Sequence, residues 1–170
     1  MPAADVNGLH IEYDTLGAPK ARPLVLIMGL STQMVAWPDR FCDLLVRAGH
    51  FVVRFDNRDV GLSSKLTDLG VPDLDRLASE SGRCSEQPPY TLSDMAAEAA
   101  GLMDALGLDR AHICGLSMGG MIAQIMAMEM PERVASLISL ESTTSEPDLP
   151  GASPEAVEAL MSKPPFRRAA

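Results

Sequence analysis

One short segment of the sequence places a serine where it could act as a nucleophile. The run Gly115-Leu116-Ser117-Met118-Gly119 fits the pattern G-x-S-x-G, which in enzymes presents a serine hydroxyl on a sharp turn between a strand and a helix. Such a turn crowds the neighbouring backbone, and the two glycines provide the lack of bulk that it requires. The helix that follows directs amide N–H groups and a partial positive charge toward the serine. The pattern therefore predicts Ser117 as a nucleophile that attacks a carbonyl carbon.

The segments on either side of Ser117 are of the kinds that this turn needs. Residues 111–116 form an apolar run typical of a buried strand, and residues 118–130 are apolar on nearly every face, which indicates a buried helix. The alternative is a plain Gly-Ser loop at the start of a helix, without chemistry. A dinucleotide-binding loop is less well supported, because Ser117 takes the place of the middle glycine of GxGxxG. The sequence also lacks the glycine-lysine-serine/threonine run of a P-loop.

A second segment could stabilise the negative oxygen of a tetrahedral intermediate. Such an oxygen needs fixed N–H donors. The first is the amide of the residue after the nucleophile, here Met118, and the second comes from a loop after an earlier strand. Met28-Gly29-Leu30 ends the apolar run 23–28, and Gly29 allows a close approach of the backbone. We therefore predict that the amides of Leu30 and Met118 form an oxyanion hole.

The base that Ser117 would need is not evident in the sequence. Hydrolysis by a serine uses a histidine base and an acid that orients it, and in this arrangement both follow the nucleophile along the chain. The three histidines, His10, His50 and His112, all precede Ser117. His112 lies five residues before it, about 16 Å along an extended strand. We expect all three to be surface or structural residues.

The remaining pattern predicts a sheet that positions these residues. Asn7-Gly8 is a hairpin signal, and the alternating segment 9–15 after it indicates a half-buried strand. Thr91 and Asp94 fit a capping box that begins a helix. Apolar runs typical of buried strands alternate with helical segments: strands at 23–28, 51–55, 111–116 and 134–140, helices at 38–48, 91–106 and 118–130, and a last helix from Ser153-Pro154. This alternation predicts an α/β fold with helices on both faces of a mostly parallel sheet.

These features together resemble the α/β-hydrolase fold family. The resemblance rests on the run 24–30, on Trp37-Pro38, on the run Arg-Phe-Asp-Asn-Arg-Asp-Val-Gly-Leu-Ser-Ser from Arg54 to Ser64, and on residues 115–120. The chain is most similar to the branch of small esterases, polyketide methylesterases and cofactor-free haloperoxidase-like enzymes, and the match extends to about Leu149. Met28-Gly29 stands where relatives often have His-Gly. The oxyanion donor is a backbone group, so this difference need not remove it.

The resemblance also implies how the chain is divided. The family's sheet has eight strands, of which about six are expected here. Residues 1–144 would then form the N-terminal part of the hydrolase core, and residues 145–170 would begin a cap region. The later strands and the histidine loop would lie outside these 170 residues.

Two further assignments follow from the resemblance. Some relatives place the acid of the triad after the strand equivalent to 134–140, which makes Glu141 the candidate, with an ordinary loop carboxylate as the alternative. The segment 56–63 is expected to be a structural turn that shapes the floor of the pocket. Residues 57–89 are polar and rich in glycine and proline, which predicts a long surface loop that contains short helical turns.

Two functions remain open from the sequence. The first is a serine hydrolase that acts on a carboxylic ester through an acyl-enzyme, without a metal or cofactor, with its histidine base supplied from outside this chain. The second is a truncated, non-catalytic hydrolase module that binds a ligand or a partner. A histidine within hydrogen-bond reach of Ser117 would distinguish the first from the second.

The composition of the chain excludes some classes of binding partner. A net charge of −9 repels nucleic acids and anionic lipid, so we expect a small-molecule ester rather than either of these. The sequence has no run of 18 apolar residues and no basic start followed by an apolar segment, so we expect a cytoplasmic protein that does not span a membrane. Three cysteines without a CxxC pair suggest neither a zinc site nor a disulfide framework.

The strand predicted at 134–140 is expected to be an open edge of the sheet. Its sequence, Val-Ala-Ser-Leu-Ile-Ser-Leu, contains no charge and no proline, the residues that usually protect a free edge. We therefore expect this edge to recruit a partner strand, either from a complementary C-terminal fragment or from a second copy of the chain.

Overall fold

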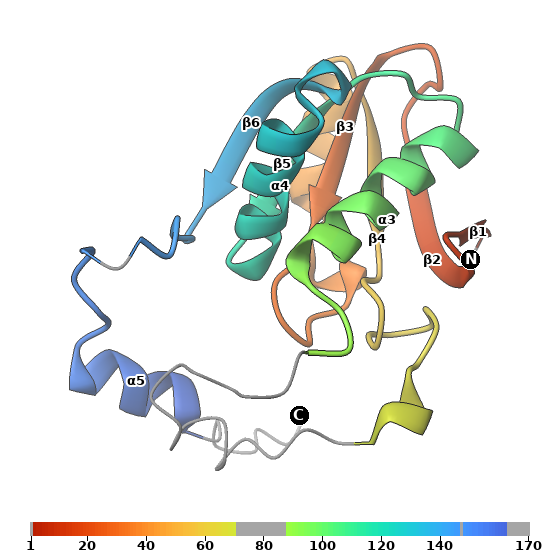
Figure 1. Ribbon diagram of the computed structural model, residues 1–170. Coiled ribbons are helices and arrows are strands. Elements are labelled where there is room, and N and C mark those ends of the chain that lie inside the picture. Colours follow the sequence, from red (N-terminus) through yellow and green to blue (C-terminus); the bar gives the residue numbers. More distant parts are fainter. Residues whose placement is uncertain (1, 71–87, 147, 163–170) are drawn as a thin grey trace, which may run out of the picture.

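A single sheet organises the chain (Figure 1). The computed structural model describes residues 2–70, 88–146 and 148–162. Within them, six strands lie in the order β1 (Ala3–Val6), β2 (Leu9–Leu16), β4 (His50–Phe55), β3 (Arg22–Ile27), β5 (Ala111–Leu116) and β6 (Val134–Leu140). The strands β4, β3, β5 and β6 run parallel, and β1 and β2 are antiparallel to their neighbours. The predicted α/β fold with a mostly parallel sheet is confirmed.

Helices cover both faces of this sheet, as predicted. The helix α1 (Asp39–Arg47) contacts β4 and β2 on one face, while α3 (Leu92–Ala105) and α4 (Met118–Glu129) pack against each other on the opposite face. Alternation along β3 sends its side chains to different cores: Val25 and Ile27 join the cluster under α3 and α4, whereas Leu24 and Leu26 join the cluster under α1. Burial on both faces explains why this strand is an uninterrupted apolar run.

Local signals in the sequence correctly identify several turns and caps. Asn7 and Gly8 both have positive φ angles, of 52° and 80°, at the hairpin between β1 and β2. Thr91 and Asp94 form both hydrogen bonds of a capping box at the start of α3. The side chain of Ser153 likewise accepts the amide of Ala156 at the start of α5 (Pro154–Met161).

The helix α4 is less buried than its sequence suggests. Its inner side is enclosed at Gly119, Gly120, Ile122, Ala123 and Met126, but Met128 is 72% exposed. An apolar helix is buried all round only when neighbours cover every side. Here β3, β5, β6 and α3 contact α4, and in the described part of the chain they leave its outer side open. The prediction of a buried helix is therefore confirmed for the inner side of α4 and wrong for its outer side.

The remaining elements are short. The 3₁₀ turns η1 (Met34–Ala36), η2 (Thr67–Leu69) and η3 (Pro131–Arg133) complete the described chain. The turn η2 agrees with the short helical turns expected within 57–89, of which residues 71–87 lie outside the described residues. After β6 the chain leaves the sheet toward α5 (Figure 1), and the proposed division at residue 144 stays a prediction. No helix among the described residues is long and apolar enough to cross a membrane.

Candidate active site

Ser117 occupies a sharp turn between β5 and α4. It lies between Leu116, the last residue of the strand, and Met118, the first of the helix, with φ 54° and ψ −121°. A positive φ is costly for any residue with a side chain and persists only where the surroundings fix it. Here the Ser117 amide donates to the carbonyl of Leu140 at 2.9 Å, and its carbonyl accepts the amide of Gly120 at 2.8 Å. The side chain is exposed at the carboxyl ends of the parallel strands.

The glycines around Ser117 are required by space. A Cβ atom added at Gly115 would lie 2.0 Å from the carbonyl oxygen of Gly119, and one added at Gly119 would lie 2.1 Å from the carbonyl oxygen of Ile27. Real Cβ contacts are essentially never shorter than 3.0 Å. The start of α4 therefore lies directly against β5 and the end of β3. The turn at Ser117 depends on both glycines, for the steric reason that the sequence pattern indicates.

The loop after β3 lies beside Ser117. A Cβ at Gly29 would stand 3.2 Å from the Cβ and 3.6 Å from the Oγ of Ser117, so the backbone at Gly29 is in near contact with the serine. Leu30 and Met118 line the same pocket. The structure thus brings the two predicted oxyanion donors to one place, and their function as donors stays a prediction.

A buried carboxylate clamps this loop to the segment after β4. The Oδ1 atom of Asp56 accepts the amide of Met34 at 2.7 Å, and its Oδ2 atom accepts the amide of Leu62 at 3.1 Å. Asn57 donates from Nδ2 to the carbonyl oxygen of Met28 at 3.0 Å. Both Asp56 and Asn57 are buried. These contacts agree with the structural role expected of the segment 56–63, which holds the Gly29 loop in position.

Replacing Asp56 by alanine is expected to destabilise the fold by about 2–4 kcal/mol. The substitution leaves the amides of Met34 and Leu62 without their acceptor, and a buried donor left unpaired costs about 1–3 kcal/mol. Urea unfolding of the variant measures the loss. Asp43→Ala, at an exposed position in α1, is the matched control and should change stability by less than about 0.5 kcal/mol. Equal stability of the two variants would show that Asp56 is not a clamp.

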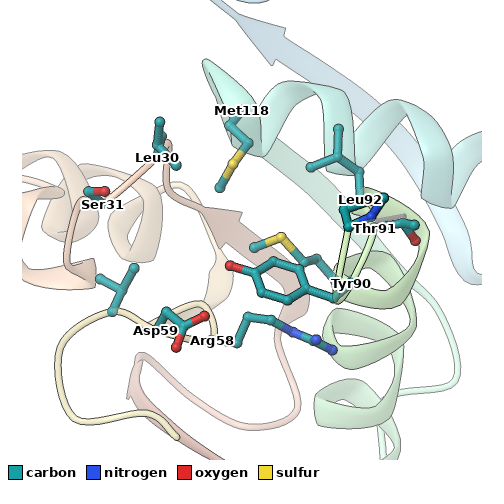
Figure 2. A pocket seen from close by; sticks show the side chains of 11 residues that line it. Leu30, Ser31, Arg58, Asp59, Tyr90, Thr91, Leu92 and Met118 are labelled. Atoms are coloured by element: carbon teal, nitrogen blue, oxygen red, sulfur yellow. The ribbon is translucent and has the colours of Figure 1, made fainter. Parts of the chain in front are cut away.

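A pocket of about 400 Å³ opens next to the turn. Figure 2 shows Leu30 and Met118 on one side of it, with Arg58, Asp59 and Tyr90 across from them. Arg58 and Asp59 belong to the segment 56–63, which the sequence predicts to shape the floor of the pocket. Tyr90 was not singled out from the sequence, because it is 31 residues beyond Asp59 and no local pattern connects the two. The pocket size falls within the range of small-molecule sites, which is about 300–1,000 Å³.

The positive charge at this pocket is paired within the protein. Arg58 forms an ion pair with Glu98 of α3, whose side chain is only 2% exposed, and its guanidinium carbon lies 4.4 Å from the centre of the Tyr90 ring. The Tyr90 hydroxyl is directed toward Asp59 (Figure 2). Burial raises the pKa of Tyr90, and the nearby carboxylate of Asp59 raises it further, so the phenol stays neutral.

Two of the histidines lie at the opposite end of the sheet. His50 begins β4, and His112 pairs with Leu24 near the start of β3, whereas Ser117 follows the end of β5. The His112 Nδ1 atom lies 2.7 Å from the Oγ of Ser136, and its ring meets that of His50 edge-on at 5.6 Å. Burial lowers the pKa of His112, and neighbouring cations lower it further. Neither histidine reaches Ser117, as expected.

The third histidine is separated from Ser117 across the sheet. His10 lies on β2, which is three strands from β5 in the order β2–β4–β3–β5. At about 4.8 Å per strand, this amounts to about 14 Å. The chain's own histidines, 10, 50 and 112, therefore do not provide a base for Ser117.

Glu141, the predicted acid, follows β6 directly and is exposed, with φ 47°. Its neighbour Leu140 accepts the amide of Ser117, so the Glu141 backbone lies close to the turn. No hydrogen bond between described residues joins the side chains of Ser117 and Glu141, and the acid role of Glu141 stays a prediction. Among the described residues, no group of three or more His, Cys, Asp or Glu side chains is arranged to hold a metal ion.

The fold and the turn at its centre place the chain among the α/β hydrolases. It belongs to the alpha/beta hydrolase fold family, whose model matches residues 22–168. Rhodomycin D methylesterase of Streptomyces peucetius is 37% identical over 122 residues, which is 72% of this chain and 35% of that protein. A putative carbamate hydrolase of Caulobacter vibrioides is 33% identical over 151 residues, 87% of this chain and 47% of that protein.

Solved structures lead to the same fold. The enol-lactonase from Burkholderia xenovorans has a TM-score of 0.66 and 27% sequence identity, and the match covers 83% of this chain and 46% of that one. The chain thus spans less than half the length of these relatives. These relatives are named as a methylesterase, a putative carbamate hydrolase and an enol-lactonase.

Proposed function

We propose that this chain is part of a serine hydrolase that cleaves a carboxylic ester through an acyl-enzyme. The observation that supports this most is the backbone of Ser117, held at positive φ between a strand and a helix with the Gly29 loop in near contact. A strained, exposed serine at the carboxyl ends of parallel strands is expected where the strain serves a function.

The geometry allows a defined sequence of steps. The Oγ of Ser117 attacks the ester carbonyl carbon as a base removes its proton, and the carbonyl oxygen becomes negative. The amides of Leu30 and Met118 donate hydrogen bonds to that oxygen, and the N-terminus of α4 adds a favourable dipole. The alcohol leaves with a proton from the base. Water then attacks the acyl carbon and releases the acid and the free serine.

An ester is the substrate class that the relatives support best. The protein with 37% identity is named as a methylesterase, and others are named as carbamate hydrolases or as an enol-lactonase. All three names describe attack at a carbonyl carbon bonded to oxygen. The same serine chemistry serves each of them, and of these three proteins the methylesterase has the highest identity to this chain.

The histidine base has to come from outside the described residues. The distances of His10, His50 and His112 from Ser117 exclude the chain's own imidazoles. A complementary segment of the same hydrolase would supply the histidine, with Glu141 as the candidate acid next to it. Without such a segment, the chain would bind a ligand or partner and turn nothing over, which is the second candidate function.

Added imidazole is expected to restore ester hydrolysis to the isolated chain. If the missing group is an imidazole base, a free imidazole that diffuses to Ser117 should accept its proton. The difference in the rate of p-nitrophenyl butyrate hydrolysis between wild type and Ser117→Ala should then rise with imidazole concentration and level off. The measurement compares wild type with Ser117→Ala at each concentration, because imidazole cleaves activated esters by itself.

The difference between these two proteins isolates catalysis by Ser117. N-methylimidazole serves as a second base of similar basicity. An identical rate for wild type and Ser117→Ala at every concentration of either base would contradict the hydrolase proposal and favour the binding module.

The edge strand β6 is expected to make the chain associate. Only Val134 of this strand is buried, and Ile138 is 44% exposed, so both its hydrogen-bonding edge and its apolar side chains are available. Light scattering should give a mass above the 18.2 kDa of one chain. Ile138→Lys should lower that mass toward one chain, whereas Val157→Lys, on the exposed side of α5, should not. A monomeric wild type would contradict this expectation.

A further inference from the structure

One wall of the pocket is built from four side chains that the proposed chemistry does not use. Tyr90 lies across the pocket with its hydroxyl toward Asp59, and Arg58 lies under its ring (Figure 2). Glu98 of α3 holds Arg58 from behind. Two segments 40 residues apart, one after β4 and one in α3, are joined by this ion pair.

The electrostatic character of this wall follows from its pairings. The positive charge of Arg58 is offset by Glu98, which is almost fully buried. Asp59 accepts the amide of Leu66 at 2.7 Å, and the hydroxyl of Tyr90 is directed toward it (Figure 2); both of these groups are neutral. The wall therefore has one carboxylate charge that no cation in it offsets, because the positive charge of Arg58 is already offset by Glu98.

The shape of the wall favours a flat ring. One face of Tyr90 is covered by the guanidinium of Arg58, so the phenol is held in a fixed orientation. The thioether side chains of Met95 and Met118 line the same pocket, and both sulfur and aromatic rings pack favourably against an aromatic ligand. Leu30, Val60 and Leu92 complete an apolar lining.

We infer that Tyr90 and Asp59 determine specificity: the pocket accepts an uncharged ester that contains a planar aromatic ring and discriminates against esters that bear a carboxylate. This inference rests on the proposed function in one respect, namely that the ligand is an ester. The wall itself is a binding feature, and its preference for ring and charge can be measured without any turnover.

The test measures dissociation constants by NMR titration of the chain with three methyl esters of similar size. They are methyl 2-naphthoate, its saturated decahydro analogue, and the monomethyl ester of a naphthalene dicarboxylic acid. The naphthoate is expected to bind about 3- to 10-fold more tightly than the saturated ester. The carboxylate-bearing ester is expected to bind about fivefold more weakly than the naphthoate, because the Asp59 charge is partly screened by solvent.

Variants separate the two effects. Tyr90→Leu should abolish the preference for the aromatic over the saturated ester, and Tyr90→Phe, which keeps the ring, should preserve it. Asp59→Asn removes the charge, keeps an oxygen for Leu66 and tolerates the positive φ of 64° at this position. It should bring the affinity for the carboxylate-bearing ester close to that for the naphthoate.

The outcomes distinguish this inference from the proposed function. Equal binding of aromatic and saturated esters, an Asp59→Asn variant with an unchanged charge preference, or no binding of any ester would overturn the inference. If both preferences are found but Ser117 shows no reactivity, the inference stands and the hydrolase proposal fails. If Ser117 reacts while the preferences are absent, only the inference fails.

Discussion

A Gly119→Val variant is expected to lose the native fold. The added Cβ would lie 2.1 Å from the carbonyl oxygen of Ile27 and 2.8 Å from that of Met28. Both contacts are with backbone, which cannot move aside as a flexible side chain would. Overpacking of a well-packed interior costs about 1–3 kcal/mol and sometimes more. Because the valine would displace the strand β3 from α4, we expect its cost to lie at the upper end of this range. The expected loss exceeds about 3 kcal/mol.

Circular dichroism and urea unfolding measure this loss. Gly151→Ala is the matched control, because a Cβ there has nothing within 4 Å and no positive φ to oppose it; it should melt as the wild type does. A smaller step, Gly119→Ala, keeps the test informative if the valine variant is insoluble, and it should still reduce stability. A folded Gly119→Val with an unchanged melting temperature would refute the packing of the turn against β3.

The predictable part of this molecule is the part with a local cause. The glycines at 115 and 119 are needed by contacts within a few residues or with the adjacent strand, so a five-residue pattern identifies the turn at Ser117. The hairpin at Asn7-Gly8 and the capping box at Thr91 have causes of the same kind, since each depends on neighbours along the chain. The buried strands follow from uninterrupted apolar runs because both faces of the sheet are covered.

The partners of Arg58 and Asp59 at the pocket could not be found in the same way, although the segment 56–63 that contains both was expected to shape the pocket floor. Arg58 and Glu98 are 40 residues apart, and each is a charged residue that by itself indicates an exposed surface. Only the fold brings them together and buries them as a pair. Tyr90 follows a proline-rich segment with no periodic pattern, so neither its contact with Arg58 nor its position beside Asp59 has a signal in the sequence.

The helix α4 shows the opposite error, in which a strong local signal is overinterpreted. Its apolar residues occur on nearly every face, yet the described chain covers only the side that meets β3, β5, β6 and α3. Periodicity reports which faces of a helix are apolar and not whether a neighbour is present. The exposed outer sides of α4 and β6 are consistent with a chain that spans less than half the length of its relatives.

Ser117→Ala is expected to abolish covalent labelling by a fluorophosphonate, the largest functional effect of any single substitution here. The probe phosphonylates an activated serine hydroxyl, and the oxygen that becomes negative in the reaction would use the same donors as an ester carbonyl. The substitution removes one small, exposed side chain, so stability should change by less than about 0.5 kcal/mol. If the stability is unchanged, the loss of labelling results from the loss of the nucleophile and not from unfolding of the chain.

Labelling should be slow in the isolated chain and faster with imidazole. Without a base the serine is a weak nucleophile, and the residual reactivity that remains after loss of a triad member is small. The same imidazole that is expected to restore ester hydrolysis should therefore accelerate the appearance of the label. His112→Gln, at the far end of β5, is the matched control and should label at the wild-type rate.

Mass spectrometric mapping of the fluorophosphonate label tests the central proposal most directly. The wild-type chain, incubated with the probe and imidazole and then digested, is predicted to contain a single labelled residue, Ser117. The Ser117→Ala variant, treated in parallel, is predicted to contain none. A label at another residue of the wild type, or a label that survives in Ser117→Ala, would contradict the assignment of Ser117 as the nucleophile.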